Sequence, residues 1–173
     1  ETEMAVITTL GVPDNQGNTT TIMPKLAYRF RVNFIGESFS GVPTRSVVST
    51  TRPSLTHDEV TVDAYNSRIY LAGKHTWDPI SIVLRDDVDS AVLRELNNQL
   101  NRQVDHANQA SSRAGSGYKF QMLVESLDGG NPTPGVLDKF ELAGCYIANI
   151  QYGDMAYSNS DQVQVTVSIR YDN

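Results

Sequence analysis

The residues that could carry chemistry in this chain are few and widely spaced. Histidine occurs only at positions 57, 75 and 106, and these positions lack the spacing of metal ligands. His57, Asp58 and Glu59 are the most suggestive group, but we place them at the tip of a hairpin, where catalytic geometry is hard to hold. We therefore predict no metal site and no cofactor.

The acidic and thiol groups also favour structural roles. Asp86, Asp87 and Asp89 could hold a divalent ion, but a calcium loop needs a longer ligand series that closes on Glu. They are instead predicted to cap the helix that follows. Cys145 is the only cysteine, so an intrachain disulfide is excluded. No flanking charge activates the thiol, and we predict that Cys145 is a buried small residue. The chain has no G-x-S-x-G elbow, and we predict that it is not an enzyme.

Composition narrows the classes of function further. The chain has 173 residues, 39% hydrophobic and 20% charged, with a net charge of −6. An acidic chain without a Lys/Arg cluster is not expected to grip nucleic acid, because neutralised phosphates supply most of that affinity. No apolar run approaches the roughly 20 residues that span a bilayer, so we expect no membrane anchor. No signal peptide is visible at the N-terminus, which begins at Glu1. Because the chain does not begin with Met, we expect that it is trimmed or processed.

Period-two alternation of apolar and polar residues dominates the chain and predicts strands. The predicted strands are 28–34, 44–51, 59–64, 68–71, 80–84, 118–125, 139–152 and 163–171, with a short one at 4–10. In residues 28–34 the aromatic side chains are expected to point inward. A β-bulge is expected near Gly144, and residues 55–58 and 72–74 are expected to form turns.

One segment has helical periodicity instead. Val88, Val92, Leu96, Leu100 and Val104 recur at four-residue steps, which predicts the only convincing helix, at about 88–108. The predicted fold is mainly β, a β-sandwich or barrel with this one flanking helix. Residues 26–173 form the β domain, and residues 1–25 form an N-terminal arm that is mobile or contacts a neighbour.

Several short segments together resemble the tail tube proteins of contractile-tailed bacteriophages. They are the basic-aromatic strand at 28–32, Thr51-Arg52-Pro53, the Arg-x-x-x-Ala-Gly step at 68–73 with Thr76-Trp77-Asp78, the strand-Asp-helix step at 80–96, and the final strand ending in Tyr171-Asp172. The type VI secretion tube and the tubes of R-type bacteriocins share this fold.

The resemblance implies a structural protein of the virion tail, assembled in the host cytoplasm. Six subunits would form a ring, their sheets would join into one inner barrel, and the rings would stack into a tube. The implied partners are other copies of the chain, the tail sheath, the tape measure protein, the baseplate hub and the tail terminator. DNA would pass through the tube during genome ejection without specific binding.

Three groups of residues are candidates for roles in such a tube. The inter-ring hairpin candidates are Arg52, Pro53, His57, Asp58 and Glu59. The channel-lining candidates are Thr61, Asp63, Gln164, Thr166 and Ser168. The candidates for a structural joint are Arg68, Ala72, Gly73, Trp77 and Asp78.

Two alternatives stay open at the level of sequence. The chain could be a tube subunit of a phage-tail-like injection particle or of a type VI secretion system, which share the fold. It could also be a stand-alone β-sandwich module that binds sugar or peptide through exposed tyrosines.

Overall fold

The computed structural model describes residues 24–111, 117–129, 134–158 and 160–173. Its elements are β1 (Phe30–Ile35), α1 (Val42–Ser46), β2 (Val47–Thr50), β3 (Leu55–Ala64), β4 (Ser67–Trp77), β5 (Ile80–Arg85), α2 (Ala91–Gln103), β6 (Val104–Asp105), β7 (Ala110–Ser111), β8 (Phe120–Leu127), β9 (Val136–Gln151) and β10 (Gln164–Arg170). The prediction of a mainly β protein is confirmed. The strand expected at 4–10 and almost all of the arm expected at 1–25 lie outside the described residues.

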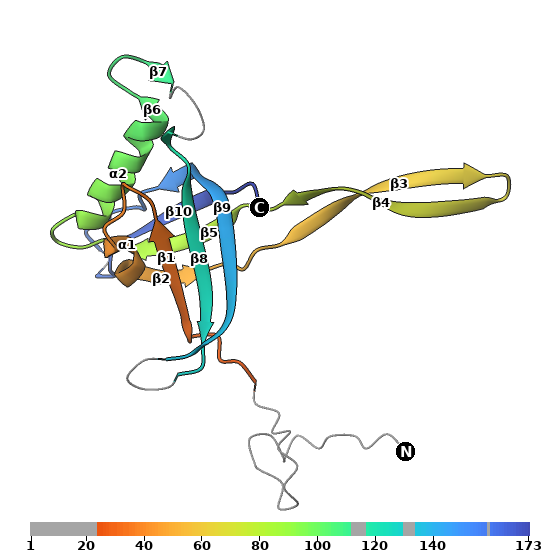
Figure 1. Cartoon of the computed structure of the whole chain (residues 1–173). Helices are drawn as coiled ribbons and strands as arrows, with labels where there is room; N and C mark the ends of the chain where they lie inside the picture. Colours follow the sequence, from red (N-terminus) through yellow and green to blue (C-terminus); the bar gives the residue numbers. More distant parts are fainter. Residues whose placement is uncertain (1–23, 112–116, 130–133, 159) are drawn as a thin grey trace, which may run out of the picture.

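The body is one six-stranded sheet in the order β1-β8-β9-β10-β5-β2, and every pairing in it is antiparallel (Figure 1). The long strand β9 joins its two halves, because its first part pairs with β8 and its last part pairs with β10. The β8–β9 register shifts between Phe120 and Met122, and Gly144 has a φ of 67° there. The predicted bulge near Gly144 is therefore confirmed.

A single hydrophobic core fills the space between the curved sheet and α2. Its members come from one face of each long body strand and from the helix, as the alternating sequence predicts. They are Val32, Phe34, Ile80, Ile82, Leu84, Val92, Leu96, Phe120, Met122, Val124, Leu142, Cys145, Ile147, Val165, Val167, Ile169 and Tyr171. Burial of each large apolar side chain contributes about 1.5–3 kcal/mol, so these residues hold the two halves of the sheet together.

The inward direction predicted for the aromatic residues of the first strand holds only in part. Phe34 is buried and Phe30 packs against the core, but Tyr28 is 71% exposed. A turn closes just before the strand, where the Arg29 N–H donates to the Leu26 carbonyl oxygen at 3.1 Å. Tyr28 therefore precedes β1 and does not share its alternation.

The predicted helix is present but shorter than the 88–108 expected. Val92 and Leu96 are buried as predicted, whereas Val88 is fully exposed and Val104 begins β6 with extended backbone. Asp105 explains the early end, because its carboxylate accepts hydrogen bonds from the Ala107 and Asn108 N–H groups. Such local side-chain bonds compete with continuation of a helix.

The predicted capping by Asp86, Asp87 and Asp89 is wrong. The Asp86 and Asp87 carboxylates accept bonds from the next backbone N–H along the chain, outside the helix. The N-cap is Ser90, which has left-handed backbone geometry and makes no side-chain cap bond. Asp86 and Asp87 instead accept hydrogen bonds within the turn between β5 and α2.

The strand predicted at 44–51 is also only partly present. Residues 42–46 form the short helix α1, and only β2 (Val47–Thr50) is extended. Pro43 lies in the first turn of α1, where its fixed φ and missing N–H favour a helix start. The protein therefore has a second helix that the apolar pattern does not indicate.

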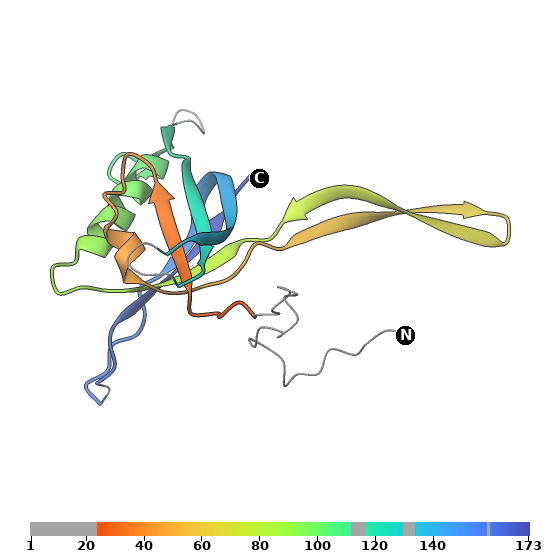
Figure 2. The ribbon, with the colours of Figure 1, turned by 60° about the horizontal axis from the view of Figure 1, so that its bottom comes forward.

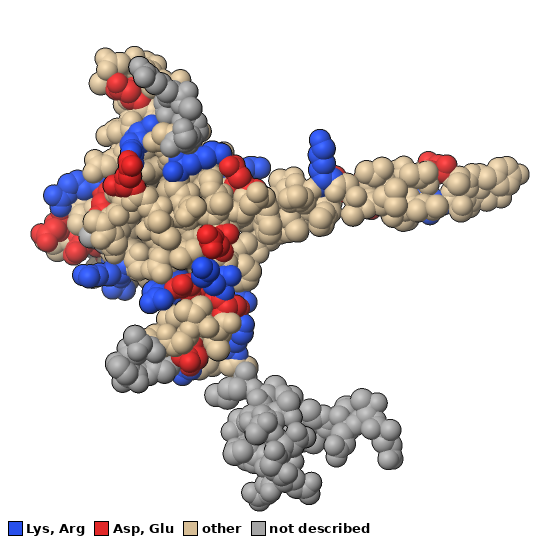
Figure 3. Space-filling view, in the orientation of Figure 1, with Lys and Arg blue, Asp and Glu red and all other residues tan. Residues whose placement is uncertain are grey.

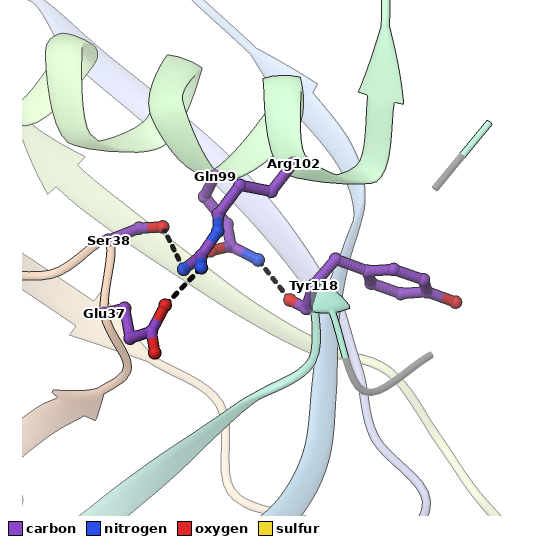
Figure 4. A network of polar contacts seen from close by, with 5 residues as sticks. All are labelled: Glu37, Ser38, Gln99, Arg102 and Tyr118. Atoms are coloured by element: carbon purple, nitrogen blue, oxygen red, sulfur yellow. Dashed lines mark hydrogen bonds and ion pairs between the residues drawn. The ribbon is translucent and has the colours of Figure 1, made fainter. Parts of the chain in front are cut away.

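Two glutamine side chains of α2 form hydrogen bonds with backbone groups of Tyr118 and Ile147. The Gln103 side chain donates to the Ile147 carbonyl oxygen and accepts from the Ile147 N–H, both at 3.0 Å. It therefore replaces a strand partner for β9 beyond Cys145, which is opposite the first residue of β8. Gln99, which is buried, donates to the carbonyl oxygen of Tyr118 (Figure 4).

Arg102 adds a surface contact on the same helix. Its guanidinium pairs with the Glu37 carboxylate and donates to the Ser38 hydroxyl at 3.2 Å (Figure 4). Both partners follow β1, so this network ties the helix to the loop after the first strand.

We expect Gln103→Ala to lower the free energy of unfolding by about 1–2 kcal/mol, because Ile147 would lose both of its bonds to the amide. Asn98→Ala, on an exposed position of the same helix, is the matched control and should change stability by less than about 0.5 kcal/mol. Urea unfolding followed by circular dichroism measures both. Equal stability of the two variants would contradict the strand-replacement role.

Candidate functional site

The most distinctive feature is a two-stranded ribbon formed by β3 and β4, which pair only with each other among the described strands. The ribbon projects from the body on the side opposite the two helices in both views (Figures 1 and 2). The strands meet at Tyr65 and Asn66, where Tyr65 has a φ of 47°. We call this hairpin the ribbon.

Two of the predicted turns are wrong. Residues 55–58 lie in β3 and residues 72–74 lie in β4, so neither segment is a turn. The prediction of a turn at 72–74 failed because glycine favours turns, whereas Gly73 lies opposite Asp58 at a β-bulge. A Cβ at position 73 would lie 2.9 Å from the Asp58 carbonyl oxygen, so the bulge favours glycine there.

The two faces of the ribbon differ in chemistry. Residues directly opposite each other share a face, and the register pairs Val60 with Leu71 and Val62 with Ile69. These four residues form what we call the apolar face. The polar face carries Glu59, Thr61, Asp63, Arg68 and Tyr70, with an ion pair of 2.6 Å between Arg68 and Asp63.

The apolar face is uncovered in the single chain. Its four large side chains are between 43% and 53% exposed, although the alternation in residues 59–64 predicts a half-buried strand. The predicted half-burial is wrong for the single chain, because all ten residues of β3 are exposed. Contiguous exposed apolar surface of this kind marks an interaction site.

Polar contacts join the two chain segments at the base of the ribbon, and an aromatic contact joins the ribbon to the body. The Asp78 N–H donates to the Ser54 carbonyl oxygen at 3.0 Å, and the Ser54 hydroxyl donates to the Asp78 carboxylate at 2.8 Å. The Trp77 ring packs on Tyr171, with ring centroids 5.7 Å apart. Trp77 and Asp78 therefore lie at the base of the ribbon.

The other predicted joint residues lie elsewhere on the ribbon. Arg68 is beside the tip, paired with Asp63, and Ala72 and Gly73 lie within β4. Only part of this predicted group is brought together.

The inter-ring candidates are divided between two segments. Arg52 and Pro53 lie in the connection between β2 and β3, whereas His57, Asp58 and Glu59 lie in β3 near the ribbon base. His57 is directly opposite His75, a pairing that the sequence analysis missed because it placed the turn between other residues. The only signal in the sequence was two histidines on either side of a hairpin turn.

The channel-lining candidates also lie on different elements. Thr61 and Asp63 are on the polar face of the ribbon. Gln164, Thr166 and Ser168 are on β10 in the body, half-buried and on one side of that strand.

Burial and hydrogen bonds shift the pKa values of several titratable side chains. Burial raises the pKa of the Cys145 thiol to about 12, and the side chain has no exposed surface. The hydrogen bond from Lys25 lowers the pKa of Asp138, and the bond to Asp172 raises the pKa of Lys119. The thiol was predicted to be buried, and that prediction is confirmed.

Charges are spread over the body, while the ribbon is mostly uncharged in the face that Figure 3 shows. Within the described residues, no group of three or more His, Cys, Asp or Glu side chains is placed to hold a metal ion. No described helix is both long and apolar enough to cross a membrane.

Comparison with known proteins by sequence gives no family. No protein-family model matches the chain, and no curated protein matches it.

Comparison by structure identifies the fold. The chain resembles a chain from the sheath-tube complex of the PVC extracellular contractile injection system in its extended state, with a TM-score of 0.64, 13% identity, and coverage of 87% of this chain and 88% of that one. It resembles a chain from the anti-feeding prophage baseplate with a TM-score of 0.64, 14% identity, and coverage of 87% and 93%. A chain from the cap that terminates the anti-feeding prophage tube gives 0.66, 11%, and coverage of 86% and 87%.

These similarities extend over most of both chains in each case. The protein therefore has the fold of tube-type proteins of contractile injection systems, as the resemblance in the sequence implied. At these identities the likeness establishes the fold and not the particular role.

We expect Cys145 to resist thiol reagents at pH 8 in the folded protein and to react once urea unfolds the chain. Burial raises the pKa of the thiol from its ordinary value of about 9 to about 12, so the folded thiol keeps its proton at pH 8. The stability that the protonated thiol contributes is lost as the pH rises from about 9 toward about 12. Labelling with a chromogenic disulfide reagent measures this. Fast labelling under native conditions would contradict the burial.

Proposed function

We propose that this chain is a tube subunit of a contractile injection particle, a structural protein whose partner is first of all another copy of itself. The observation that carries the proposal is the uncovered apolar face of the ribbon in a chain with this fold. A lone two-stranded hairpin is marginally stable in water, so an extended one implies a surface that covers it.

Assembly explains both the apolar face and the strand edges. The outer edges of β3 and β4 carry backbone groups without strand partners in the described chain, and such edges promote pairing with another chain. Packing the apolar face on neighbouring subunits would remove Val60, Val62, Ile69 and Leu71 from water. At about 25 cal/mol per Å² of apolar area, the gain grows with each subunit added.

The polar face would then point into the channel. Thr61 and Asp63 lie on it, and Gln164, Thr166 and Ser168 would join them if the ribbon of one subunit continued the sheet of the next. A lining of hydroxyl, amide and carboxylate groups suits a conduit, because a basic lining would bind phosphates. The net charge of −6 favours the same conclusion.

The finer proposal is the arrangement of a phage tail. Six copies form each ring, rings stack, and a sheath, a tape measure protein, a baseplate hub and a terminator complete the tail of the virion. DNA passes through the channel without specific binding.

A second candidate function is the tube of a particle that injects cargo other than DNA. It is supported by the structural neighbours, which come from an extracellular contractile injection system and the anti-feeding prophage. Nucleic acid in purified particles that contain this chain separates the two: packaged DNA favours the phage tail, and particles free of DNA favour the injection device.

Assembly should depend on the apolar face. We expect Val62→Asp combined with Ile69→Asp to abolish rings and tubes, because two buried carboxylates would face each packing partner. Val88→Asp is the matched control, since Val88 is fully exposed and lies off the ribbon. Negative-stain electron microscopy and light scattering at equal concentration measure assembly, and circular dichroism checks the fold.

Normal tubes from the double variant would contradict the proposal. So would a wild-type chain that stays monomeric at high concentration under several salt conditions.

Charge reversal near the ribbon base tests the contact between rings separately. We expect Asp58→Lys with Glu59→Lys to shorten tubes several-fold while single rings still form. The reason is that two positive charges would replace two negative charges where the rings meet. The length distribution in micrographs measures the effect. An unchanged distribution would show that these residues lie away from the contact between rings.

A further inference from the structure

Two histidines face each other across the ribbon near its base. His57 of β3 and His75 of β4 are a directly opposed pair in the register, so both side chains are on the same face. Their ring centroids are 6.1 Å apart with an interplanar angle of 61°, and both residues are exposed. The fold therefore places two imidazoles side by side from positions 18 residues apart.

This arrangement fits the geometry of a metal chelate. Imidazole nitrogen is a preferred ligand of Zn²⁺, Cu²⁺ and Ni²⁺. With metal–nitrogen distances of about 2.0–2.1 Å, two imidazoles on one tetrahedral ion have donor atoms roughly 3.3 Å apart. Rings whose centroids are 6.1 Å apart reach that spacing by small rotations of exposed side chains, without a change in the backbone.

The surroundings leave the pair open on one side and supported on the other. The His75 ring contacts Trp77 edge to face, with centroids 6.4 Å apart, and Trp77 packs on Tyr171. This aromatic stack limits the motion of His75. Because no larger group of ligands is present in the described part of the chain, water would complete the coordination of an ion held by the pair.

We propose that His57 and His75 form a two-histidine site for a divalent transition metal ion, with Cu²⁺, Zn²⁺ and Ni²⁺ as the ions of matching chemistry. A bound ion clamps β3 to β4 immediately before the bulge that contains Gly73. It thereby stiffens the ribbon near its base. The site stands on the hairpin geometry alone and does not depend on the role of the chain in a tube.

Trp77 provides a direct readout, because it is the only tryptophan in the chain and lies against His75. We expect Cu²⁺ to quench its fluorescence in a saturable titration that ends at one ion per chain. His57→Gln and His75→Gln should each weaken the apparent affinity by about tenfold or more, because the second ligand acts intramolecularly. His106→Gln, in the turn between β6 and β7, is the matched control and should leave the titration unchanged.

A second measurement uses Zn²⁺, which stabilises the folded chain if it binds the folded state more tightly than the unfolded state. Excess Zn²⁺ should raise the urea midpoint of the wild-type chain and of His106→Gln, but not that of the two ribbon variants. Absence of saturable quenching, equal quenching in the ribbon variants, or loss of quenching in His106→Gln would each overturn the proposal.

Discussion

A projecting pair of strands with one apolar face is the constraint on which the rest of this protein depends. Hydrophobic burial is the main favourable term in folding, yet the ribbon leaves four large apolar residues exposed in water. The chain tolerates this cost because a well-packed body supplies the stability. A fold that keeps such a surface uncovered in one copy is suited to complete its packing with other copies.

The body is organised to hold that surface in place. Strand β9 changes partner near Gly144, which lets a single sheet curve around one core, and α2 closes the core through Val92 and Leu96. The ribbon leaves the body between β2 and β5, two adjacent strands of the same sheet. Trp77 packs on Tyr171 where the ribbon leaves the body. Rigid support of this kind allows a marginal hairpin to present a defined face.

The same geometry brings together residues with no common role in the sequence. Hairpin pairing converts separation along the chain into proximity, so His57 meets His75 and Asp63 meets Arg68. It also separates residues that the sequence grouped, since the two sets of channel candidates lie on different elements.

The sequence by itself determined the class of fold and most of the strands, because side-chain alternation is a local property that survives any tertiary arrangement. It also identified the bulge at Gly144 and the buried Cys145. The ends of α2, the short helix α1 and the true turn at Tyr65 depended on local hydrogen bonds and backbone geometry that periodicity does not record. Only the tertiary structure decided that the apolar face is uncovered, because alternation reports which residues share a face and not what packs against it.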